Sequence, residues 1–168
     1  SLGFASVSGG TVLVAAGGTA NAVLSLGFGT AAFAQAGPKT GSVQVAFLTN
    51  GKGTSELGTL SAGTQTVNLS GAVYRLAQGT LTSGSVFALP AVREGGSFSA
   101  APLGVRNSAA ADGFSEKLGV RVDSVDAVIA SGSLDLLGAG SIDASTVRVS
   151  LGGSLAASAG LKTGTPAI

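Results

Sequence analysis

The chain has 168 residues and a formal net charge of +1, with 28 glycines but no His, Cys, Met or Trp. It therefore lacks the usual general base, thiolate nucleophile and zinc ligands, and we expect neither an enzyme nor a bound cofactor. Nine Lys and Arg residues against eight Asp and Glu, with few aromatic residues, also argue against a nucleic-acid partner.

The sequence predicts no membrane span. Its first charged residue is Lys39, but Gly, Ser, Thr or Asn recurs every few positions before it, and no run of about 18 consecutive strongly apolar residues exists. The chain begins without Met and without a basic leader, so we expect a processed protein or part of a longer one.

Alternating apolar and polar residues between turn residues predict short strands along the whole chain. In chain order these are residues 11–15, 22–28, 42–48, 64–69, 72–77, 85–87, 96–101, 103–107, 116–122, 127–137 with a break near Gly132, and 146–151. Asn50-Gly51 and Asp112-Gly113 suit the left-handed backbone of tight hairpins. Strands at this spacing predict an all-β fold of two immunoglobulin-like antiparallel β-sandwich lobes.

The most informative pattern is an internal repeat. Residues 17–41 align with residues 140–164, so that Gly17 lies over Gly140 at an offset of 123 residues. Both segments end in Lys-Thr-Gly, beginning at Lys39 and Lys162, and the strand alternation keeps its phase. The core and assembly positions predicted from that alternation are Leu24, Leu26, Phe28, Val43, Val45, Phe47, Val147, Val149 and Leu151.

With this period the chain holds more than one repeat but fewer than two. Residues 1–73 are predicted to form a lobe from the later part of one repeat, and residues 85–168 a lobe from the earlier part of the next, with a linker strand at 74–84. Each lobe then lacks strands that the other has. We expect neighbouring subunits or repeats to supply them, because open sheet edges pair readily with another chain.

Three short motifs resemble a known family. Val92-Arg93-Glu94-Gly95, Val105-Arg106-Asn107-Ser108-Ala109 and Leu118-Gly119-Val120 resemble the pattern of abnormal-spindle/hydin-like immunoglobulin-type repeats, found in bacterial surface proteins that include "choice-of-anchor" arrays. The resemblance implies a structural or adhesive role outside the cell and brings no catalytic residues with it.

Two kinds of chemical site remain as candidates. Asp112 and Glu116 are the first place to look for a calcium site, although their spacing alone more often marks solvated turns. Lys39, Lys162 and Asn107 are candidates for an isopeptide crosslink; the alternative is a pair of polar turn lysines.

The leading functional hypothesis is a structural subunit or repeat of an extracellular filament or giant cell-surface protein. Its partner would be another copy of itself, joined head to tail by strand complementation. The alternative is an adhesin or carbohydrate-binding β-sandwich module, for which the single tyrosine, Tyr74 beside Arg75, gives slight support.

Overall fold

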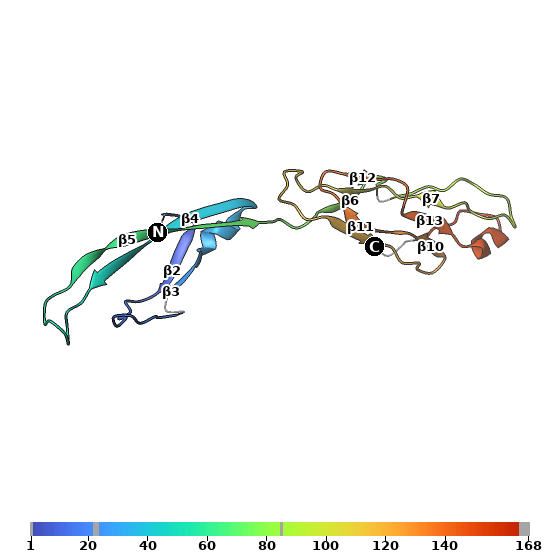
Figure 1. The fold of residues 1–168 in the computed structure, drawn as a ribbon. Helices are drawn as coiled ribbons and strands as arrows, with labels where there is room; N and C mark the ends of the chain where they lie inside the picture. Colours follow the sequence, from blue (N-terminus) through green and yellow to red (C-terminus); the bar gives the residue numbers. More distant parts are fainter. Residues whose placement is uncertain (1, 22–23, 85, 165–168) are drawn as a thin grey trace. The chain divides into compact units, whose positions relative to one another are not determined.

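The structure is a computed structural model and describes residues 2–21, 24–84 and 86–164. It divides into two compact units, residues 1–73 and 74–168. The described residues form small antiparallel sheets of two or three strands, with one short 3-10 helix in each unit (Figure 1). The all-β class predicted from the sequence is confirmed.

A long hairpin dominates the first unit. Strand β4 (Gly37–Thr49) pairs with β5 (Leu60–Val73), and β1 (Leu2–Gly3) pairs with the other edge of β4. Figure 1 shows this hairpin in cyan and green. Strands β2 (Ala5–Gly9) and β3 (Leu24–Phe28) form a separate two-stranded sheet, and the 3-10 helix η1 (Thr30–Ala34) connects β3 to β4.

The hairpin is covered only near its base. Alternation along β4 places Val43, Val45 and Phe47 on one face. Val43 is buried and Val45 half-buried, but Phe47 is 44% exposed. The expectation that Phe47 is a buried core position is therefore wrong for the described residues.

The second unit contains three small sheets. Strand β8 (Val105–Asn107) lies between β6 (Gly79–Leu81) and β12 (Ile142–Asp143). Strand β13 (Arg148–Leu151) lies between β7 (Ala101–Pro102) and β10 (Val128–Ser131). Strand β9 (Leu118–Arg121) pairs with β11 (Ser133–Leu137), and the 3-10 helix η2 (Gly153–Ala157) follows β13.

The hydrophobic core cluster lies in this second unit. One buried member lies in β8, the other three lie directly after β7, directly after β9 and directly before β13, and partly buried side chains surround them. The buried residues are Leu103, Val105, Val122 and Val147, and the surrounding ones are Leu81, Leu118, Val120, Ala130, Leu134 and Leu137. Burying each such large side chain contributes about 1.5–3 kcal/mol to folding.

The backbone repeats at the offset found in the sequence. Gly37 has φ +125° and its counterpart Gly160 has φ +123°, a conformation that favours glycine. The helices η1 and η2 also begin and end at equivalent positions, each after an extended glycine. The internal repeat predicted from the sequence is therefore present in the structure.

The structural repeat begins earlier than the sequence alignment suggested. The β2–β3 register matches that of β10–β13, since Ala5 faces Phe28 as Val128 faces Leu151. Even the left-handed Gly3, at φ +68°, has its counterpart in Asp126 at φ +52°. We call residues 3–41 the first copy and residues 126–164 the second copy.

Several predicted elements need correction. Residues 86–87 and 96–100, where strands were expected, form none. Residues 74–84 are not a free linker strand: β6 lies within them, and the Arg75 N–H donates to the Phe114 carbonyl at 3.0 Å. Residues 11–15 form no strand, although their counterparts in the second copy form β11. The beginnings of two other predicted strands, Ala22-Val23 and Ser85, lie outside the described residues.

Candidate assembly interface

In the second copy, strand β13 is paired on both edges. Strand β10 occupies one edge, and β7 the other, with Arg148 facing Pro102 and Val149 facing Ala101. The Leu103 N–H continues the contact by donating to the Val147 carbonyl at 2.8 Å. Segment 101–103 thus closes this edge of β13.

In the first copy, the equivalent edge is open. Strand β3 pairs with β2 as β13 pairs with β10, but no described residue pairs with its other edge. An open edge presents unpaired N–H and C=O groups that can receive another strand.

Equivalent side chains of the two copies differ in exposure where, in the described part of the chain, the first copy lacks a second strand beside β3. Leu24 is 43% exposed, whereas its counterpart Val147 is fully buried at 0%. Positions that face solvent in both copies give the control: Leu13 is 74% exposed and its counterpart Leu136 is 71% exposed. Leu24 therefore differs from its counterpart at the place where β3 has no second partner strand among the described residues.

The other predicted core positions follow the same division. Val147 and Val149 are buried as expected, and Leu151 is half-buried. Leu26 and Phe28 are also only half-buried. The alternation predicted for β3 is therefore present, but the prediction that Leu24 is buried like its counterpart in the second copy is wrong. Alternation fixes which side chains share a face, and packing decides whether anything covers that face.

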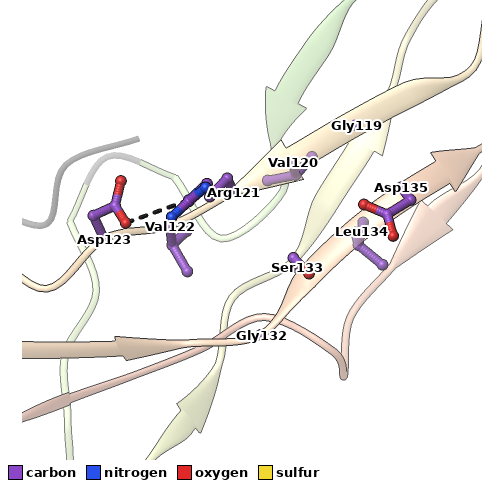
Figure 2. A pocket seen from close by; sticks show the side chains of 9 residues that line it. All are labelled: Gly119, Val120, Arg121, Val122, Asp123, Gly132, Ser133, Leu134 and Asp135. Carbon is purple, nitrogen blue, oxygen red and sulfur yellow. Dashed lines mark ion pairs between the residues drawn. The ribbon is translucent and has the colours of Figure 1, made fainter.

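The open surface extends beyond β3. In the second copy β11 pairs with β9, and residues 119–123 and 132–135, on and beside these strands, line a pocket (Figure 2). In the first copy the equivalent residues 10–14 have no strand partner among the described residues, and Val14 is 43% exposed. The lining ion pair in the pocket, Arg121 with Asp123 at 3.5 Å, is highly exposed and contributes little.

Asn107 fastens β8 to three other segments of the second unit. Its side chain is fully buried, and its Oδ1 accepts the N–H groups of Gln78 and Ala109, both at 3.2 Å. Its Nδ2 donates to the carbonyls of Glu116 at 3.2 Å and Leu137 at 3.1 Å. All four hydrogen-bonding positions of the amide are satisfied, as a buried amide requires.

This geometry supports a hydrogen-bonding role for the Asn107 side chain, which we call the Asn107 clamp, rather than a covalent crosslink. Conversion of its amide to an isopeptide would remove the Nδ2 donor pair. The candidate lysines are occupied differently: the buried Lys39 has its Nζ 5.0 Å from the centre of the Phe4 ring, and the Lys162 Nζ donates to Ser158 Oγ at 3.0 Å.

The calcium candidates lie near each other but are used for other contacts. The Asp112 carboxylate accepts Arg75 Nη1 at 2.6 Å and the Phe114 N–H at 3.0 Å. The hydrogen bond from Arg75 and then that from Phe114 hold the pKa of Asp112 below its ordinary value. Glu116 takes part through its main chain, which bonds Arg75 and Asn107. Among the described residues, no group of three or more His, Cys, Asp or Glu converges as a metal site would need.

Further large apolar side chains are exposed near the tip of the hairpin. Phe47, Leu48 and Leu60 are 44%, 59% and 71% exposed, and β5 forms an outer edge of its sheet. Sequence reasoning missed this exposure, and it also missed segment 101–103 as the cover of β13. The repeat itself was the available signal, because it identifies which strands of one copy should recur beside the other.

Comparison of the chain with protein-family models, with curated proteins and with solved structures gave no match. No helix in the described part of the chain is long and apolar enough to cross a membrane.

Proposed function

We propose that this chain is a structural subunit or repeat of an extracellular filament or giant cell-surface protein. Neighbouring copies complete one another's sheets, so that each completed lobe becomes an immunoglobulin-like β-sandwich. The proposal rests on one observation. Strand β13 of the second copy is paired on both edges, whereas the equivalent strand β3 of the first copy is paired on one edge only among the described residues.

The composition supports the same proposal. A chain without His or Cys, with 10% charged residues and a high content of small side chains, suits an inert packed fibre better than a reactive site. A head-to-tail contact between copies does not close on itself and therefore extends into a filament. The resemblance to surface-protein repeats agrees with an extracellular or cell-surface location.

The oligomeric state of the purified chain tests this proposal. We expect concentration-dependent assembly in light scattering, binding of a dye that reports exposed apolar surface at low concentration, and fibres by negative-stain electron microscopy. A folded, monodisperse monomer that binds no dye at any concentration would refute it. A glycan array with specific hits and no fibres would favour the adhesin alternative instead.

A further inference from the structure

We infer that the open edge of β3 and the neighbouring residues 10–20 bind a segment equivalent to residues 101–107 from another copy of this repeat. The donated segment must be one that is not paired within its own copy, because residues 101–107 of this chain are already paired and largely buried in the second unit. The inference rests on the proposed function and specifies its interface. Its basis is the contact already present in the second copy, transferred by the offset of 123 residues.

The transfer fixes a register along β3. Because Val149 faces Ala101, Leu26 should face the incoming Ala101. Because Leu103 donates its N–H to the Val147 carbonyl, the incoming Leu103 should donate to the carbonyl of Leu24. The incoming Leu103 would then cover the Leu24 side chain, whose counterpart in the second copy is fully buried.

A second set of contacts supports the same occupant. In the second unit, Asn107 donates its N–H to the Ser141 carbonyl at 3.0 Å, accepts the Gly140 N–H at 2.8 Å, and donates Nδ2 to the Leu137 carbonyl. The counterparts of these three groups are Gly18, Gly17 and Val14.

The receiving groups of the first copy already have the required turn. Gly17 is left-handed at φ +73°, as Gly140 is at +77°. The Gly18 N–H donates to the Ala15 carbonyl at 2.9 Å, matching the bond from Ser141 to Gly138 at 3.1 Å. The turn that receives the main chain of Asn107 is therefore preformed, which lowers the cost of ordering on binding.

Some contacts do not transfer. The bonds of the Asn107 side chain to Gln78 and Glu116 have no counterpart in the described part of the first copy. In the second unit Arg148 Nη2 donates to the Ala100 carbonyl at 2.8 Å, and the counterpart of Arg148 is Ser25, which cannot span that distance. The main-chain register and the Asn107 contacts must therefore supply the specificity.

A crosslinking experiment tests the register, and the absence of native cysteine makes it unambiguous. The probe is a synthetic peptide of residues 96–109 carrying Ala101→Cys. We expect it to form a disulfide with the Leu26→Cys chain under mild oxidation. The matched controls are Val149→Cys, where the edge is already occupied by β7, and Ser25→Cys, one residue out of register. Both should crosslink far less.

Binding of unmodified peptide to the unmodified chain provides a second readout that no cysteine variant can disturb. An Asn107→Ala peptide should bind about three- to ten-fold more weakly, because the side-chain hydrogen bond that corresponds to Asn107 Nδ2 with the Leu137 carbonyl is lost. A Ser99→Ala peptide should bind as the parent does. Equal affinity of the Asn107→Ala and parent peptides would overturn the transferred clamp.

The outcomes separate this inference from the proposed function. Fibres without peptide binding, or Leu26→Cys chains that crosslink only to each other, would overturn the inference while leaving assembly intact. Equal crosslinking at Ser25 and Leu26 would overturn the register. In-register peptide binding by a chain that never assembles would support the interface and refute the filament.

Discussion

Replacing Asn107 by Ala should destabilise the second unit strongly. The substitution removes four hydrogen bonds and leaves two N–H groups and two carbonyls without their partner in or beside the core. Each such bond contributes about 0.5–1.5 kcal/mol net, and the partners on the exposed residues Gln78 and Glu116 can regain water. We therefore expect a loss of about 3–5 kcal/mol in the free energy of unfolding.

Tyrosine fluorescence during urea unfolding measures this loss. Tyr74 is the single tyrosine and there is no Trp, so the signal reports the second unit, where the Tyr74 ring lies 5.8 Å from that of Phe114. The control is Ser108→Ala, which removes one exposed hydrogen bond to the Gln78 carbonyl and should change stability by less than about 0.5 kcal/mol.

A charge variant sharpens the test. Asn107→Asp keeps the shape but turns an acceptor toward the carbonyls of Glu116 and Leu137, so we expect it to be destabilising at neutral pH and partly rescued in acid, when the carboxyl is protonated. If the Asn107→Ala chain unfolds at the same urea concentration as the Ser108→Ala chain, the proposed role of the Asn107 hydrogen bonds is refuted.

Three further predictions follow from the same contacts. Val147→Ala should cost about 2 kcal/mol in urea unfolding and Leu24→Ala less than about 1 kcal/mol in the unassembled chain; equal costs would show that Leu24 is covered. Because the folded pKa of Asp112 is depressed, its pair with Arg75 stabilises the second unit above the unfolded pKa of about 3.9 and is lost as the pH falls through the folded value. Asp112→Asn should therefore flatten the acid limb of the melting temperature, and an unchanged limb would contradict the assignment. Intact mass spectrometry should show no loss of ammonia, because the Asn107 amide is used as a clamp; a mass lower by one ammonia would establish the crosslink.

The sequence was informative where local residues determine the backbone. The glycines at 37 and 160 marked the same left-handed position in both copies, and the alternation through 146–151 predicted the strand that became β13. Such features depend on short-range sterics and side-chain period, which the sequence contains directly.

The sequence was less informative where a strand depends on a distant partner. Residues 11–15 alternate well but form no strand in the first copy, while the small residues of β2, from Ala5 to Gly9, form one because β3 lies beside them. Asn107 was singled out for a crosslink, yet three of the four partners of its side chain come from segments 9–30 residues away that only the fold brings together. Strand formation at these sites is decided by tertiary context.

Amide hydrogen exchange of matched segments tests the central claim most directly, namely that the first copy is left open where the second is closed. In the dilute, unassembled chain, we expect residues 10–21 and 24–26 to exchange much faster than their counterparts 133–144 and 147–149, and to become protected when the chain assembles. Equal protection of the two segments in the monomer would contradict the account.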